Sequence, residues 1–77
     1  MKIVSLKTGE SGIIEKVDGQ GAMRKRLLDM GLTPNTRITL YKRAPMGDPV
    51  ELIVRGYHLT LRVSETENIT LKEDASE

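Results

Sequence analysis

The stretch MRKRLLDMGLTPNTRITLYKRAPMGDPVELIVRGYHLTLR, residues 23–62, decides the fold of this chain. A short basic segment ends at a glycine, and three strand-like runs follow, separated by turns rich in proline and glycine. Nothing in the stretch pairs a nucleophile with a base in the way that a catalytic site requires. The pattern therefore predicts a small β domain that docks onto another molecule and is not an enzyme.

Apolar residues at every second position predict the strands, because this period is typical of antiparallel strands with one buried face. Arg55-Gly56 is the expected tight turn between the last two strands of the stretch, with the glycine supplying a positive φ. We expect a mainly β, small SH3-like barrel that is closed or nearly closed, because closure removes the free edges of a sheet. The expected antiparallel strands, about five, are residues 13–17, 37–43, 50–54, 57–63 and 69–71.

One short α-helix, from about residue 22 to residue 30, is expected to interrupt the series of strands. Apolar residues at i, i+4 and i+7 make one face of this segment, and a basic cluster lies on the other. Gly31 suits the left-handed residue that ends a helix, and Leu32 beyond it is expected to pack back on Leu27.

Three smaller features are expected from local chemistry. Residues 33–36 form a turn in which Asn35 takes a positive φ. A one-turn helix near residues 64–67 opens on Ser64 as its N-cap. The first residues, around Ile3, form either another sheet edge or a packed arm.

A chain of 77 residues is expected to make a single domain, residues 1–77, and a domain near this size buries only ~60% of its unfolded surface. The sequence holds no cysteine, which excludes disulfides and thiolate metal sites. It contains no stretch like a signal peptide or a membrane span, so we expect a cytoplasmic protein without direct membrane insertion. The acidic tail, residues 73–77, is expected to be disordered.

The charge distribution is more informative than the net charge of +1. Residues 24–62 hold eight Lys and Arg against three Asp and Glu, whereas the flanks hold four against eight. A basic middle predicts an electropositive face that meets an acidic partner surface or a phosphate ligand. Ordinary solvated charge on strand and helix exteriors is the alternative.

Two motifs that follow one another along the chain resemble those of a known family. RLLDMGLTPNTRI (residues 26–38) followed by APMGDPVELIVRGYHLTLR (residues 44–62) resembles the FeoA domain of ferrous iron transport, and the resemblance extends from about residue 6 to residue 71. Asn35 stands where the family often has glycine, and both residues suit a corner with positive φ. The resemblance implies an SH3-like, cytosolic, non-catalytic accessory protein of ferrous iron uptake. It also implies binding to the cytosolic GTP-binding domain of a FeoB-type transporter, and a barrel like the C-terminal domain of DtxR-type repressors.

Met46 is the leading candidate for partner contact. It lies at the tip of the loop at residues 44–49, where Pro45 and a second proline limit the freedom of the backbone. An unbranched thioether at an exposed tip suits an adaptable apolar contact. The alternative is that Met46 folds back and caps the end of the barrel.

Four arginines are expected to add electrostatic attraction around this anchor. Arg43 and Arg55 are expected near the same hairpin region as the loop, and Arg24 and Arg26 on the basic face of the helix. The alternative for the helix is a solvated face on which Asp29 pairs with a basic neighbour.

Other functions have weaker support. A nucleic-acid-binding SH3-like barrel that uses the basic middle segment is the main alternative, but two tyrosines are a poor supply of stacking platforms. His58 is the single histidine and shares its strand face with Arg62, so we predict no metal site. The glycine pair at residues 19–21 is interpreted as a turn in preference to an anion site. No catalytic or cofactor-binding residue is predicted. Oligomeric state, weak metal binding, and whether the partner is activated, stabilised or recruited stay open.

Overall fold

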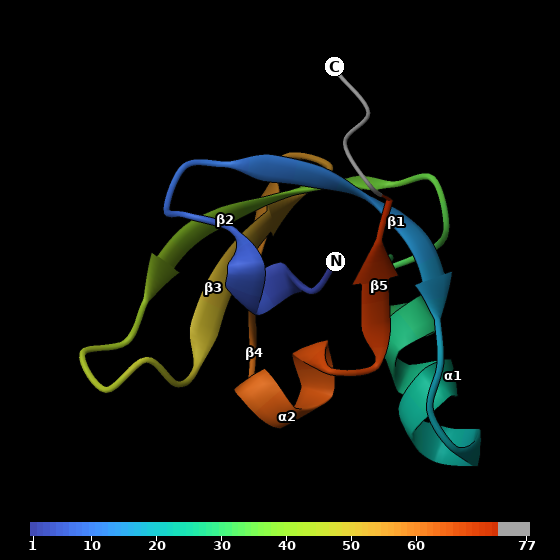
Figure 1. Ribbon diagram of the computed structural model, residues 1–77. Helices are drawn as coiled ribbons and strands as arrows, with labels where there is room; N and C mark the ends of the chain where they lie inside the picture. Colours follow the sequence, from blue (N-terminus) through green and yellow to red (C-terminus); the bar gives the residue numbers. More distant parts are fainter. Residues whose placement is uncertain (73–77) are drawn as a thin grey trace.

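The computed structural model describes residues 1–72 and folds them around one strongly curved sheet (Figure 1). The five strands are β1 (Ser11–Val17), β2 (Arg37–Arg43), β3 (Val50–Val54), β4 (Tyr57–Leu61) and β5 (Ile69–Leu71). Their spatial order is β4-β3-β2-β1-β5, and every neighbouring pair is antiparallel. The predicted mainly β, SH3-like architecture is confirmed, with one refinement. β4 and β5 stand at the two ends of the sheet and do not pair with each other, so the curled sheet is open. The predicted disordered tail lies outside the described residues.

The α-helix α1 (Gly21–Asp29) connects β1 to β2, as predicted, and ends in a Schellman motif. Gly31 has a φ of 93°, and its N–H donates to the Leu28 carbonyl at 3.0 Å. The N–H of Leu32 donates to the Leu27 carbonyl at 3.2 Å, and both side chains are fully buried. The end of the helix is thereby fixed to the core. No helix in the described part of the chain has the length and apolar character needed to cross a membrane.

Two local predictions have different outcomes. Asn35 adopts a φ of 71°, as predicted for the turn before β2. The one-turn helix α2 (Val63–Thr66) also forms, but its N-cap is Arg62, so the predicted cap by Ser64 is wrong. The helix starts one residue earlier than predicted, and the carboxylate of Glu65 accepts a hydrogen bond from the Arg62 N–H at 2.9 Å. An acidic side chain in the first turn therefore supplies the capping oxygen.

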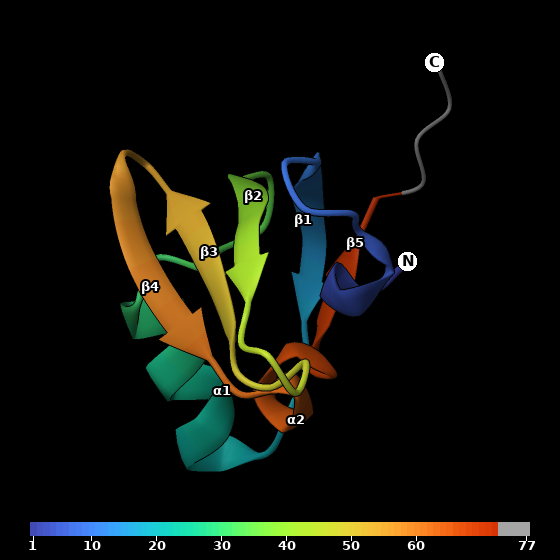
Figure 2. The ribbon, with the colours of Figure 1, turned by 90° about the vertical axis from the view of Figure 1, so that its left-hand side faces the viewer.

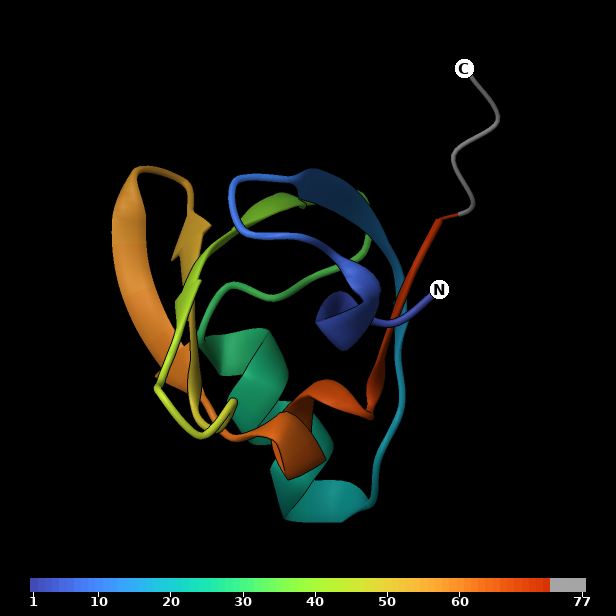
Figure 3. The same cartoon turned by 60° about the vertical axis from the view of Figure 1, so that its left-hand side comes forward.

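One apolar core fills the curl of the sheet. The 3-10 turn η1 (Ile3–Ser5) lies inside the curl (Figure 3), and Ile3 is fully buried, so this turn is a packed arm, while Lys2 before it pairs with the edge of the sheet. From α1, Leu27 is fully buried, while Met23 and Leu28 pack against the core from its margin. Burial of this apolar surface is the main term that stabilises the fold. The buried apolar residues are Ile3, Leu6, Ile14, Val17, Leu27, Leu32, Ile38, Leu40, Val50, Leu52, Val54, Leu61, Ile69 and Leu71.

The two edges of the sheet differ in how they are covered. The outer side of β5 is closed by the start of the chain, where Lys2 pairs with Thr70. The N–H of Leu71 donates to the carbonyl of Met1 at 2.7 Å, which extends this closure. β4 forms the other rim, and no strand among residues 1–72 lies beyond it (Figure 2).

Candidate partner-docking surface

The β2–β3 loop, residues 44–49, presents Met46 at its tip. Met46 is 92% exposed, and its neighbour Pro45 is exposed as well. A 2.9 Å backbone hydrogen bond between the first and last residues of the loop closes its base. The carboxylate of Asp48 accepts a hydrogen bond from the Val63 N–H at 3.0 Å, which ties the loop to α2. The alternative in which Met46 folds back onto the end of the barrel is therefore wrong, and an anchored loop holds its apolar tip in solvent.

Arg43 and Arg55 lie at opposite ends of β3, so the prediction that they share one hairpin region is wrong. Arg43 is paired with Val50 beside the β2–β3 loop. Arg55 follows Val54 in the β3–β4 turn. The physical reason is the length of the strand: five residues at about 3.3 Å each separate the two turns. Of these two arginines, only Arg43 lies beside the loop that carries Met46.

Two of the candidate arginines hold backbone carbonyls inside the molecule. The guanidinium of Arg43 donates to the carbonyls of Val4 and Leu6 at 2.8 and 2.9 Å, which ties the N-terminal segment to β2. Nε of Arg24 donates to the Val17 carbonyl at 3.0 Å and joins α1 to the end of β1. Sequence reasoning missed both contacts because the acceptors are main-chain groups, which leave no signature in the side chains.

Arg26 forms an ion pair with Glu65 across the junction of α1 and α2. The Glu65 side chain is only 9% exposed, whereas that of Arg26 is 53% exposed. Asp29 pairs on the helix surface, as the alternative of a solvated face expected, with Lys25 Nζ at 2.9 Å from its carboxylate. The basic face of α1 is therefore partly neutralised by contacts within the chain.

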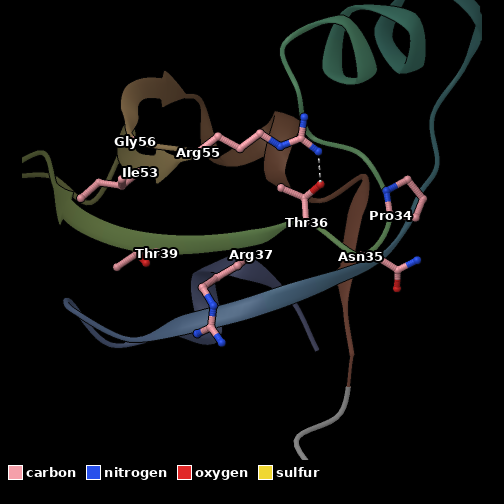
Figure 4. A pocket seen from close by; sticks show the side chains of 8 residues that line it. All are labelled: Pro34, Asn35, Thr36, Arg37, Thr39, Ile53, Arg55 and Gly56. Atoms are coloured by element: carbon pink, nitrogen blue, oxygen red, sulfur yellow. Dashed lines mark hydrogen bonds between the residues drawn. The ribbon is translucent and has the colours of Figure 1, made fainter.

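An open hollow of about 600 Å³ lies beside the β3–β4 turn (Figure 4). In it, the guanidinium of Arg55 donates to the hydroxyls of Thr36 and Thr33 at 2.9 and 3.2 Å. The side chain of Arg37 extends in the opposite direction (Figure 4). Because the two guanidinium groups diverge, they do not form a shared site for one anion. The hollow is lined by Pro34, Asn35, Thr36, Arg37, Thr39, Ile53, Arg55 and Gly56.

His58 is held by neighbours on the outer face of the sheet. Its Nδ1 lies 2.6 Å from the Glu51 carboxylate, and its ring meets the ring of Tyr41 edge-on with 4.7 Å between centroids. Nζ of Lys42 lies 6.0 Å from the centroid of the same tyrosine. Within residues 1–72, no group of three or more His, Asp or Glu side chains is placed to hold a metal ion.

Taken together, the curved sheet and its connecting helix define a small SH3-like domain. The chain belongs to the FeoA domain family, whose model matches residues 1–73. It is 35% identical over 72 residues to an Fe(2+) transport protein A/Fe(2+) transporter FeoB fusion protein of Porphyromonas gingivalis. That match covers 94% of this chain but 8% of the relative, so the chain spans less than a tenth of the length of the fusion protein.

Two solved structures of FeoA proteins share both sequence and fold with the chain. The FeoA protein from Chlorobium tepidum is 38% identical with a TM-score of 0.84, over 92% of this chain and 68% of that one. Iron(II) transport protein A from Clostridium thermocellum is 29% identical with a TM-score of 0.88, over 94% of this chain and 44% of that one. These likenesses confirm the family resemblance that the two motifs indicated.

More distant structures show the fold alone. A FeoA from Stenotrophomonas maltophilia, described as a prokaryotic SH3 domain protein, is 22% identical with a TM-score of 0.82. It matches over 94% of this chain and 89% of its own. A manganese-dependent transcriptional repressor is 12% identical with a TM-score of 0.81, over 91% of this chain and 35% of the repressor. The expected likeness to one part of a metal-dependent repressor is thereby confirmed.

Proposed function

We propose that the chain is a non-catalytic accessory protein of ferrous iron uptake that binds the cytosolic GTP-binding domain of a FeoB-type transporter. The family match and the FeoA/FeoB fusion in Porphyromonas gingivalis support this partner. Fusion of two domains raises their effective concentration for each other, which is useful when the separate domains bind weakly. The proposal places the chain at the cytoplasmic side of the membrane, where the GTP-binding domain lies.

The exposed side chain of Met46 is the observation that carries the proposal. Met46 is a large apolar residue that is 92% exposed at the tip of a closed loop. A partner that covers it removes much apolar surface from water, which contributes strongly to the free energy of binding. The loop is tied at its base and through Asp48, so docking costs little additional order. A flexible thioether can also adapt to the shape of the receiving pocket.

The arginines have a secondary part in the proposed contact. Arg43 flanks the loop, and the half-exposed guanidinium of Arg26 still presents positive charge on α1. Arg24 lies on α1 and Arg55 in the β3–β4 turn, and both belong to the basic middle of the chain, residues 24–62. Exposed charges of this kind speed the encounter with an acidic surface more than they strengthen the final complex. Because these side chains also make contacts within the chain, their removal affects the fold as well as binding.

A titration with charge-matched variants tests the proposal. Met46→Asp is expected to weaken binding to the nucleotide-loaded GTP-binding domain at least about tenfold, whereas Met46→Leu retains most of the affinity. The control is Lys72→Gln, which changes the net charge by the same amount at an exposed position just beyond β5, outside the proposed contact. The N–H of residue 72 still donates to the Ile13 carbonyl, so this control keeps the fold.

The outcomes of the titration separate the partner from the contact surface. If the unaltered chain shows no heat of binding even at low salt, the assignment of the partner fails. If the chain binds and Met46→Asp binds equally well, the β2–β3 loop is not the contact. Equal unfolding midpoints in urea for all variants are required before affinities are compared.

A further inference from the structure

The outer side of β4 is an uncovered sheet edge (Figures 2 and 3). In the described part of the chain, no backbone hydrogen bond outside the sheet ladder involves a β4 residue. The opposite edge is treated differently, because Lys2 pairs with Thr70 and closes it. A row of unpaired N–H and C=O groups is a template for another strand. The structure therefore leaves one place where the sheet can accept an additional strand.

The β3–β4 turn fixes which groups of β4 face outward. Arg55 and Gly56 have φ values of 51° and 84°, which is the type I′ geometry of a two-residue hairpin turn. Val54 and Tyr57 flank the turn and are register partners, so they form a hydrogen-bonded pair. Hydrogen-bonded and non-hydrogen-bonded pairs alternate along an antiparallel ladder. The backbone of the residue that follows Tyr57 therefore points away from β3, and so does every second residue after it.

His58 and Thr60 are these outward-facing residues. They are the register partners of Ile53 and Glu51, and both are exposed. Their N–H and C=O groups face solvent, whereas those of Leu59 face β3. Two donors and two acceptors are thus presented along the rim at the spacing that a partner strand requires.

β4 also lacks the devices that usually protect an edge. Its sequence, YHLTL, contains no lysine, proline or acidic residue. The β3–β4 register runs without a shift, whereas the β1–β5 and β2–β3 pairs each contain one. Charges, prolines and bulges are the common means of blocking edge pairing. An edge without them is available for strand addition.

We propose that the outer edge of β4 is a strand-addition site for an extended segment of the partner protein, with an uncharged centre and acidic residues at both ends. Arg62 follows β4 and is exposed, and Arg55 precedes β4 with a guanidinium that donates to Thr36 and Thr33, so a basic residue flanks the strand at each end. Main-chain hydrogen bonds would supply affinity and the flanking charges would select the segment. The inference rests on the proposed function for the identity of the partner. Asp48 ties the β2–β3 loop to Val63, just beyond β4, so one partner can cover both surfaces.

A second copy of this chain fits the edge less well. Antiparallel pairing of two β4 strands about Leu59 would place Arg62 opposite Gly56 of the second copy, next to its Arg55. Two such clusters of like charge would form, and like charges side by side across strands are destabilising. An acidic-flanked segment meets the same arginines with opposite charge.

Amide hydrogen exchange followed by NMR tests the edge directly. In the free protein, the amides of His58 and Thr60 are expected to exchange rapidly, while those of Leu59 and Leu61 are protected by β3. The probe is a synthetic peptide with alternating valine and threonine between two terminal glutamates. It is expected to slow exchange at residues 58 and 60 and to shift their signals. A peptide of the same composition with N-methylated amides on its binding edge is expected to do neither.

Two variants extend the test to the protein partner. Thr60→Pro removes an outward donor without breaking the ladder to β3, so we expect a fold close to the original and about tenfold or greater loss of affinity for the GTP-binding domain. Leu59→Pro removes a donor to β3 and is expected to destabilise the protein, which checks the assigned orientation. Arg62→Glu is expected to weaken binding about two- to fivefold at low salt.

The outcomes distinguish this inference from the proposed function. The edge assignment is overturned if the unaltered chain binds the GTP-binding domain while residues 58 and 60 stay unprotected. Unchanged affinity of a folded Thr60→Pro variant overturns it as well. Protection that rises with protein concentration alone, together with a dimer in sedimentation, would assign the edge to a second copy and overturn the acidic segment. Binding of the peptide without binding of the domain supports the edge and contradicts the partner.

Discussion

The hydroxyl of Tyr57 donates a hydrogen bond to the backbone carbonyl of Met30. The contact joins the first residue of β4 to the C-cap of α1, 27 residues earlier in the chain. Carbonyl groups at the end of a helix lack intrahelical partners, so a side chain that reaches one completes the cap. The tyrosine thereby couples the position of the edge strand to the position of the helix.

Replacement of Tyr57 by phenylalanine removes this hydrogen bond and little else. We expect Tyr57→Phe to lower the free energy of unfolding by about 0.5–1.5 kcal/mol, measured by urea denaturation. Tyr41→Phe is the matched control, because the Tyr41 hydroxyl makes no hydrogen bond within residues 1–72. Equal midpoints for the two variants would show that the contact with Met30 does not stabilise the protein.

Gly31→Ala is expected to be costly for two separable reasons. The residue has a φ of 93°, where a side chain costs about 1–2 kcal/mol, and an added Cβ would lie 2.7 Å from the hydroxyl oxygen of Tyr57. Gly9 has a φ of 91°, and a Cβ added there would meet no atom within 4 Å, so Gly9→Ala carries the first cost alone.

The difference between the losses of unfolding free energy in Gly31→Ala and Gly9→Ala therefore measures the steric clash with the Tyr57 hydroxyl. In the Tyr57→Phe background the nearest remaining atom of residue 57 would be 3.9 Å away, and we expect the difference to shrink. A double-mutant cycle on unfolding free energies provides the measurement. A difference that persists unchanged without the hydroxyl would contradict the steric explanation.

Arg26→Ala should destabilise the protein more than Lys25→Ala does. Arg26 neutralises the carboxylate of Glu65, which is 9% exposed, so its removal leaves a buried charge with less compensation. Because the arginine itself is half exposed, we expect a loss of only about 1 kcal/mol. The Lys25–Asp29 pair is exposed at both ends and is worth about 0.3–0.5 kcal/mol. Equal losses in urea denaturation would mean that the interhelical ion pair carries no extra stability.

The fold follows closely from local patterns in the sequence. Residues 37–43 and 50–54 alternate apolar and polar side chains, and the structure forms β2 and β3 with these bounds. Gly31 and Asn35 mark turns because their positive φ values restrict the choice of residue. The cap of α2 was harder to predict, since Glu65 supplies the oxygen from inside the helix and the residue type at the N-cap then matters less.

The docking surface is less accessible to sequence reasoning. The exposure of Met46 depends on how the loop is held, and the hydrogen bond from the Val63 N–H to Asp48 spans 15 positions in the chain. Arg43 binds carbonyls that lie 37 and 39 positions away, which no spacing rule could reveal. The free edge at β4 also emerges only once the order of the strands is known.

Pairing of Lys2 with Thr70 sets a limit on stoichiometry. Sheets grow into fibres only when every molecule has two unpaired edges, because each molecule must pair with one neighbour on either side. Within residues 1–72 the start of the chain occupies one of them. The proposed strand addition at β4 would therefore leave no second open edge in this part of the chain, and it would be limited to one added segment per domain.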